Sequence, residues 1–365
     1  MGLKRLGWWL LALVAALALC GCETTSQLSE EEKERRRQAE LAHKREYLKG
    51  IQSLEESCYE SLHGLGGIVA EYNEKEGIGY AGAVFATKRF YPIDLESVVV
   101  EGYLGDWVSV RYVLEESAAD RGGLLVGDRL LWLNGKKVPK GERATSFVVG
   151  QMRKLWKVDE INELMVERNG KEIALAIEAE KAATYSVVVT PFLSEGVVAE
   201  GKTLYFSRTT MDSLEEAEVD YLCAFALVQN AMKHARMKEQ NAFIGGMLDM
   251  AAAVYGVNTG GILGSLGRNA HREGFLIESD LLALYALAAA GIDISGYPDF
   301  WEEQLTKQGK SLDRVSRKRI DAMRQVILEI DEKRVKGEAI YPTEYLAGEW
   351  ELRDLEMEAA EAGVP

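Results

Sequence analysis

The apolar and polar positions of this chain follow three patterns in succession. The stretch from Glu30 to Lys49 is dense in Glu, Lys and Arg, and the preceding Ser29 with Glu32 forms a capping-box pattern that starts a helix. Apolar residues then recur every three or four positions, at Ile51, Leu54, Cys58, Leu62 and Leu65. This period places them on one helical face. We therefore expect a long helix that is solvated at its start and packs on the body of the protein at its end.

Short strands follow, and after them apolar helices. Between about Gly79 and Glu180 the chain alternates strand patterns with turns and holds one amphipathic helix, 145–157. Beyond Tyr185, a strand and a strand pair, 196–208, precede long apolar helical segments. These patterns predict an α+β protein made of a helical stalk, a β domain and a mostly helical C-terminal domain.

The first residues have the pattern of a secretion signal. Lys4 and Arg5 precede an apolar run, 6–19, which is too short to span a membrane comfortably, and Leu19-Cys20-Gly21-Cys22 ends it. The pattern predicts a bacterial lipoprotein: residues 1–21 are removed, Cys22 carries lipid, and the protein faces the periplasm from a membrane of the cell envelope. An ordinary signal peptide or an uncleaved anchor is the alternative. Glu23 after the lipid-bearing cysteine favours the outer membrane.

The composition narrows the possible partners. The chain has 365 residues, 47% of them hydrophobic, which suffices for two domains and excludes global disorder. Its net charge of −15 argues against nucleic acid as a partner. Binding to nucleic acid is driven by the release of counterions when Lys and Arg neutralise phosphates, and this chain has no excess of Lys and Arg. An oxidising compartment would permit a disulfide between Cys58 and Cys223, whereas the apolar surroundings of Cys223 favour a buried thiol.

One motif lies in the β domain. The stretch 117–138 reads SAADRGGLLVGDRLLWLNGKKV. Ala118 and Ala119 allow a short helix to pack closely, Gly127 and Asp128 make a turn into a strand, and Asn134-Gly135 is a type I′ hairpin turn that needs positive φ twice. In register, the stretch resembles the core of PDZ domains, and we expect a PDZ domain over 79–181, after an anchor and charged stalk over 22–78.

The PDZ resemblance implies a binding groove. Members of this family add an extended peptide as a strand beside a sheet edge, opposite a helix, and a backbone nest takes the terminal carboxylate. The corresponding residues of this chain are Ala81, Gly82, Ala83, Val84, Val148 and Met152. The family's G-L-G-F loop is only loosely matched by the segment 80–85. C-terminal peptides or other envelope polypeptides are the expected partners, and an intramolecular or purely structural role of the groove is the alternative.

The second half resembles an enzyme family. The relevant stretches are GVVAEGKTLYFSR, 196–208; LEEAEVDYLCAFALVQNAMKH, 214–234; IESDLLALYALAAAGID, 277–293; PDFW, 298–301; and EIDEKR, 329–334. They resemble the zinc metallopeptidase family that includes HtpX and the CAAX prenyl proteases, some members of which are lipid-anchored and carry a PDZ domain. The resemblance implies a zincin-type domain over 182–345, followed by an acidic tail, 346–365. An unrelated helical bundle is the alternative.

The catalytic positions of that family are altered here. Its two zinc-binding histidines fall on Phe225 and Gln229, its general base on Ala226, and its third ligand on Leu276. The sequence therefore predicts a protein without catalysis and without a metal cofactor, which binds polypeptides in a chaperone-like or regulatory role in envelope protein quality control. The alternative is an active zinc metalloendopeptidase with a metal site rearranged onto other residues, namely His234, His271, Glu278 and Asp280. A passive tether is a third possibility.

Overall fold

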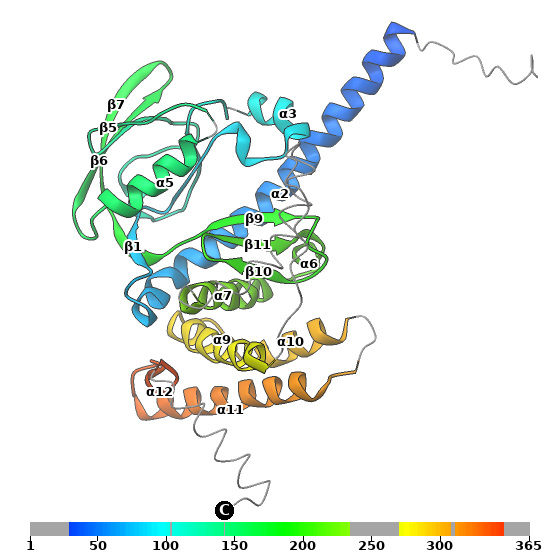
Figure 1. The fold of residues 1–365 in the computed structure, drawn as a ribbon, viewed down its shortest axis with the longest axis vertical. Helices are drawn as coiled ribbons and strands as arrows, with labels where there is room; N and C mark the ends of the chain where they lie inside the picture. Colours follow the sequence, from blue (N-terminus) through cyan, green and yellow to red (C-terminus); the bar gives the residue numbers. More distant parts are fainter. Residues whose placement is uncertain (1–28, 103, 142, 234–269, 308–310, 347–365) are drawn as a thin grey trace, which may run out of the picture. The chain divides into compact units, whose positions relative to one another are not determined.

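The computed structural model describes residues 29–102, 104–141, 143–233, 270–307 and 311–346 (Figure 1). The chain divides into two compact units, 1–46 and 47–365. The proposed lipidation site, Cys22, lies outside the described residues. No helix in the described ranges has both the length and the apolar composition that crossing a bilayer requires.

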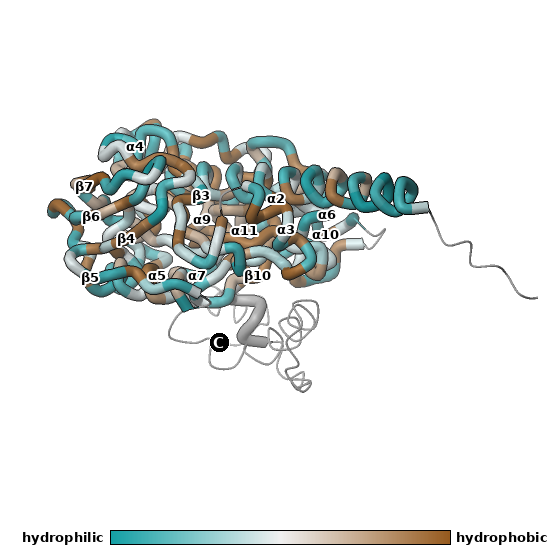
Figure 2. Tube along the Cα trace, turned by 90° about the horizontal axis from the view of Figure 1, so that it is seen from above, coloured by the Kyte–Doolittle hydropathy of each residue, from teal (hydrophilic) through white to brown (hydrophobic). Residues whose placement is uncertain are grey.

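Helix α2 (Glu30–Tyr72) begins with the expected capping box. The Glu32 amide donates to the Ser29 hydroxyl at 3.2 Å, and the Ser29 amide donates back to the Glu32 carboxylate at 3.0 Å. The first turns are mainly hydrophilic (Figure 2) and carry ion pairs between successive turns, such as Lys44 with Glu40 at 2.7 Å. In the second unit, Ile51, Cys58, Leu62 and Leu65 are buried and Leu54 is half-buried, so the expected apolar face packs on the protein.

The β region is an antiparallel sheet with a helix beside its edge. Its strands run in the spatial order β2 (Ala83–Ala86), β3 (Ser109–Val113), β4 (Arg129–Leu133), β6 (Ile161–Arg168), β7 (Lys171–Glu178), and β5 (Lys136–Lys137) pairs with β4. Helices α4 (Ala118–Arg121) and α5 (Ala144–Leu155) belong to this region, and η1 (Lys88–Phe90), η2 (Ile93–Leu95) and α3 (Glu96–Glu101) are inserted between β2 and β3. Separately, β1 (Gly77–Tyr80) pairs with β8 (Glu180–Ala183).

The motif residues occupy the places that their chemistry predicts. Ala118 and Ala119 are buried in the core of the β region. The buried Asp128 accepts the Leu125 amide at 2.9 Å and the Arg168 Nε at 2.6 Å, which fixes the turn into β4. Asn134 and Gly135 have φ values of 44° and 72°, so the hairpin joining β4 to β5 forms as expected.

The C-terminal region stacks helices on a small sheet. Strand β11 (Thr203–Ser207) pairs antiparallel with β10 (Val197–Glu200) and parallel with β9 (Ser186–Thr190). After α6 (Arg208–Met211) come α7 (Glu216–Lys233), α9 (Ala270–Ala289), α10 (Tyr297–Thr306), α11 (Arg314–Lys336) and α12 (Thr343–Leu346). Helix α7 packs between this sheet and α9, and α9 packs on α11 (Figure 1).

Helix α2 contacts both of these regions through one buried carboxylate. Glu55 forms an ion pair with Arg111 of β3, accepts the Tyr91 hydroxyl at 3.2 Å, and accepts the Val189 amide of β9 at 3.4 Å. One turn later the Tyr59 hydroxyl accepts the Val187 amide at 2.9 Å. Side chains of α2 thus take the place of a neighbouring strand along β9.

The partners of Glu55 are themselves enclosed. The Arg111 guanidinium lies 4.8 Å from the centre of the Phe90 ring and 5.2 Å from that of Tyr91. Burial raises the pKa of the Glu55 carboxyl, and the positive charge of Arg111 opposes this rise. The contacts with Arg111, Tyr91 and Val189 therefore favour the charged form of Glu55 against the effect of burial.

Both cysteines of the described region are buried free thiols. The Cys223 thiol of α7 lies 3.9 Å from the Cys58 carbonyl oxygen of α2, and burial raises the pKa of the Cys58 thiol. Of the two states that the sequence allowed, the structure has the reduced one.

Replacing Glu55 tests this connection. Glu55→Ala leaves Arg111 buried without its counter-ion, and we expect the free energy of unfolding to fall by about 3 to 5 kcal/mol. Glu34→Ala removes an exposed carboxylate from the same helix and should cost no more than about 0.5 kcal/mol. Chemical denaturation followed by circular dichroism measures both variants. Equal losses in the two variants would contradict the role given to Glu55.

Candidate functional site

One edge of the large sheet is open. Strand β2 pairs with β3 on one side, with Ala83 opposite Val113 and Val84 opposite Tyr112, and no described strand pairs with its other side. That side faces α5. An open strand edge presents amide and carbonyl groups to which an extended chain can add as a further strand.

A groove of about 350 Å³ runs along this edge. Its lining combines β1, β2, α5 and the start of the C-terminal region. The residues are Ile78, Gly79, Tyr80, Ala81, Ala83, Val84, Phe85 and Phe90; Thr145, Ser146, Val149, Gly150, Met152, Arg153 and Trp156; and Tyr59, Thr184, Tyr185, Ser186, Lys202 and Thr203. Most of them are apolar or aromatic, which suits side chains of an extended polypeptide.

The loop before β2 turns two amides outward. The Ala81 carbonyl accepts the Ala119 amide at 2.7 Å, and the Gly82 carbonyl accepts the Leu114 amide at 2.8 Å. Every described peptide bond is trans, so the amides of Gly82 and Ala83 point opposite to these carbonyls, away from α4 and β3. Gly82 has a φ of 76°, and a Cβ there would lie 2.2 Å from the Ser117 Cβ, so only glycine fits.

Most of the predicted binding residues lie at this groove. Ala81, Ala83, Val84 and Met152 line it, and Gly82 shapes the loop at its end. Val148 differs from the expectation: it is 0% exposed in the core of the β region, while Val149, 38% exposed, lines the groove. The cause is the helix geometry, since neighbouring residues differ by about 100° in direction.

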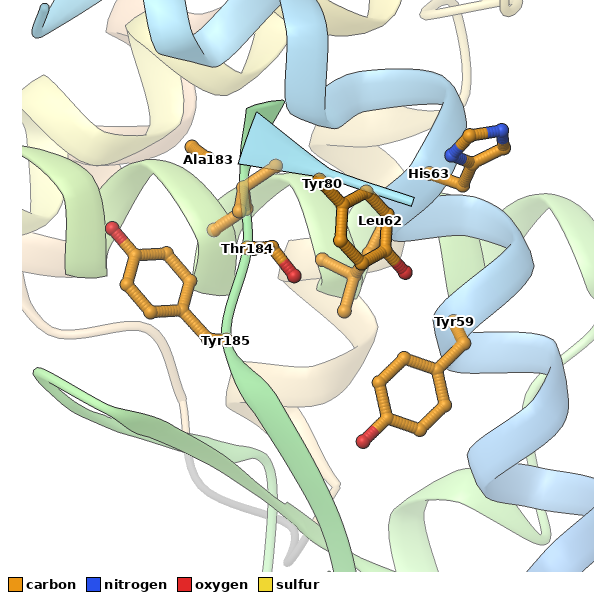
Figure 3. Close-up of a pocket in the computed structure, with 8 residues that line it drawn as sticks. Tyr59, Leu62, His63, Tyr80, Ala183, Thr184 and Tyr185 are labelled. Carbon is orange, nitrogen blue, oxygen red and sulfur yellow. The ribbon is translucent and has the colours of Figure 1, made fainter. Parts of the chain in front are cut away.

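Other lining residues lie outside the segments that the PDZ-like motif indicates. Tyr59 comes from α2, and Thr184, Tyr185, Ser186, Lys202 and Thr203 come from beyond the PDZ-like motif. Behind them, Tyr59, His63, Tyr80 and Tyr185 surround a cavity of about 10 Å³, which is no larger than one water needs (Figure 3). The Tyr185 hydroxyl donates to Glu76 at 2.9 Å, and burial raises the pKa of that phenol. This cluster forms a packed wall rather than a second ligand site.

The predicted altered positions of the C-terminal region lie on α7 and α9, which pack together. Phe225 is buried, and its ring centre lies 4.8 Å from that of Trp301. Ala226 is fully buried, whereas Gln229 and Leu276 are half-buried. The Arg319 guanidinium lies 4.1 Å from the centre of the Trp301 ring and 5.2 Å from that of Phe225.

A buried ion pair occupies the neighbourhood of these residues. Asp280 of α9 is paired with Arg319 of α11 and accepts the Tyr297 hydroxyl at 3.1 Å. Burial raises the pKa of the Asp280 carboxyl, and the positive charge of Arg319 opposes that rise. The carboxylate is thus already engaged by a cation and a hydroxyl.

These residues do not fit a catalytic zinc ion. A phenyl ring, a methyl group and an isobutyl group offer no lone pair to a metal, and the buried Arg319 guanidinium places a positive charge beside the Phe225 ring. Within the described part of the chain, no group of three His, Cys, Asp or Glu residues lies close enough to hold a metal ion. His234 lies outside that part, as does the side chain of His271, so the rearranged site stays a prediction.

The comparisons with known proteins concern the β region. The β region is a PDZ-like domain in its sequence motif, its strand order and its groove between β2 and α5. No family model matches the chain, and no curated protein matches it.

Solved structures that resemble the chain cover about 29% of it. They include a serine endoprotease from Yersinia pestis, at 19% identity and TM-score 0.21, and the HtrA-type protease AlgW with a decapeptide, at 23% identity and TM-score 0.22. The chain spans 29% and 30% of the length of these two. The PDZ domain of HtrA3 bound to a phage-derived ligand is 21% identical, with TM-score 0.22, and is covered over 88% of its length.

Removing Asp280 tests the assignment of its carboxylate to the core. Asp280→Ala leaves the buried Arg319 guanidinium without the carboxylate that pairs with it, and we expect the free energy of unfolding to fall by about 3 to 5 kcal/mol. The double variant Asp280→Leu/Arg319→Met removes both charges and should recover most of that loss. Asp299→Ala, on an exposed carboxylate of α10, is the control. Urea denaturation compares the variants, and an Asp280→Ala variant as stable as the control would contradict a structural role.

Proposed function

We propose that this chain is a peptide-binding protein whose PDZ-like groove takes C-terminal segments of other polypeptides. The observation that carries the proposal is the open edge of β2, which faces α5 across a mainly apolar groove of about 350 Å³. A strand added to this edge would exchange backbone hydrogen bonds with β2 and direct alternate side chains toward the groove.

The proposal extends to the C-terminal region. Its sequence resemblance supports a metallopeptidase-like domain of zincin type, and its altered positions support the loss of peptide-bond cleavage. Phe225 packs on Trp301, and Asp280 is neutralised by Arg319, so packing and an internal ion pair take the place of metal chemistry. The role we propose is binding without cutting, either chaperone-like or regulatory, in envelope protein quality control.

The location is part of the same proposal. Cleavage before Cys22 and lipidation of that cysteine would anchor the protein in the bacterial envelope, with the groove in the periplasm. Clients would then be envelope polypeptides. The charged first turns of α2 support a solvated stalk.

Peptide binding is tested with a defined library. Fluorescein-labelled decapeptides of mixed upstream sequence, each ending in a free Val, Leu, Ile, Phe or Ala, are titrated with the full chain by fluorescence anisotropy. We expect at least one class to bind, and Val149→Glu to weaken it by about tenfold or more, because a charge and added bulk enter the groove. Ile161→Glu, at a 69% exposed apolar residue outside the groove, should leave affinity unchanged. Absence of binding by every class would contradict the proposal.

Loss of catalysis is tested by metal content and cleavage. Purified protein exposed to zinc and then desalted should hold less than stoichiometric zinc by atomic emission, and should leave unfolded casein intact. The reason is that Phe225 and Ala226 supply no ligand and no base. Cleavage of casein that a chelator abolishes would instead establish the active metalloendopeptidase with a rearranged site.

A further inference from the structure

The groove is completed by residues from outside the PDZ-like domain. Thr184 and Tyr185 connect β8 to β9, which begins at Ser186, and Lys202 lies in the turn between β10 and β11, which begins at Thr203. The Ser186 amide donates to the Lys202 carbonyl at 3.1 Å, which holds this turn against the connection. One wall of the groove therefore belongs to the C-terminal region.

The charges around the groove are of one sign. Arg153 and Lys202 are among its lining residues, and no Asp or Glu is, although the chain has 58 acidic and 43 basic residues. Neither cation forms an ion pair with a carboxylate of the described residues, and the Arg153 Nη2 donates only a long hydrogen bond of 3.4 Å to the Thr184 carbonyl. Glu76, which accepts the Tyr185 hydroxyl, is not in the lining.

Arg153 lies at the end of the groove where the outward-turned amides are. It is in the last turn of α5, and a Cβ placed on Gly79 of β1 would lie 3.0 Å from the Cβ of Trp156, the residue that directly follows this helix. This end of α5 therefore packs beside β1, directly before the loop that carries the Gly82 and Ala83 amides.

An anion bound here needs more than two amides. The carbonyls of the last turn of a helix carry a partial negative charge, which disfavours a carboxylate at the end of α5. The Arg153 guanidinium in this turn offsets that charge and can add charge-assisted hydrogen bonds, and Lys202 brings a second cation to the same groove.

We propose that Arg153 and Lys202 bind the terminal carboxylate of the peptide, together with the amides of Gly82 and Ala83. The inference rests on the proposed peptide binding and adds its chemistry: the ligand is a polypeptide with a free C-terminus, and the C-terminal region supplies one of the two cations. The PDZ-like domain then forms a complete carboxylate site only together with the β10–β11 turn.

The test is a double-mutant cycle between protein and peptide. The best library decapeptide is prepared as the free acid and as the C-terminal amide, and both are titrated against the full chain. Wild type should prefer the acid by about tenfold or more. In Arg153→Gln/Lys202→Gln the preference for the acid over the amide should fall to about twofold or less.

Matched variants separate this effect from a change in net charge. Lys154→Gln/Lys181→Gln removes two exposed cations, one beside Arg153 on α5 and one on β8, neither of which lines the groove. It should keep the preference for the acid. Arg153→Lys, combined with wild-type Lys202, should retain a preference for the acid that Arg153→Gln loses. Thermal melts establish that each variant is folded.

Two results would overturn the inference and leave peptide binding intact: equal affinity of wild type for acid and amide, or an undiminished preference in Arg153→Gln/Lys202→Gln. The second would assign the carboxylate to the backbone amides alone. Failure of wild type to bind acid or amide would instead overturn the proposed function on which the inference rests.

Discussion

A buried carboxylate on α2 determines how the second unit is put together. Glu55 is 1% exposed, and a charge at that depth is tolerated only with partners close by. Its partners come from β3, from the segment that carries Tyr91, and from β9. Because each contact has a fixed geometry, the PDZ-like domain and the small sheet of the C-terminal region are held against the same two turns of one helix. The groove depends on this arrangement, since its walls come from both.

The groove beside β2 and the α7–α9 helix pair differ in how far their side chains and backbone groups are already engaged within the protein. At β2 the protein leaves a strand edge uncovered, lines it with apolar side chains and keeps carboxylates out of the lining. At the α7–α9 pair, Phe225 packs on Trp301, and the buried carboxylate of Asp280 forms an ion pair with Arg319. This contrast supports the proposal of binding without cleavage.

Local chemistry in the sequence predicted local structure well. The Ser29 and Glu32 capping box, the Asn134-Gly135 turn and the apolar face of α2 each depend on residues a few positions apart, so their spacing is informative. The groove was predicted only where it is made from the PDZ-like motif. Nothing distinguishes Glu55 from the exposed Glu56 beside it, because its partner Arg111 is distant in the sequence. Lys202 is likewise distant in the sequence from the PDZ-like motif whose groove it lines. Val148 and Val149 are adjacent on one helix, so a one-residue error in helix phase exchanges a core residue for a groove residue.

Hydrogen exchange measured by mass spectrometry tests the central claim most directly: that an added strand binds beside β2 and also contacts the C-terminal region. The full chain is compared with and without a saturating library peptide. The account predicts slower exchange in both segments, 83–86 and 201–204, and unchanged exchange in α11. Slower exchange in neither segment, or in the first alone, would contradict a groove built from both regions.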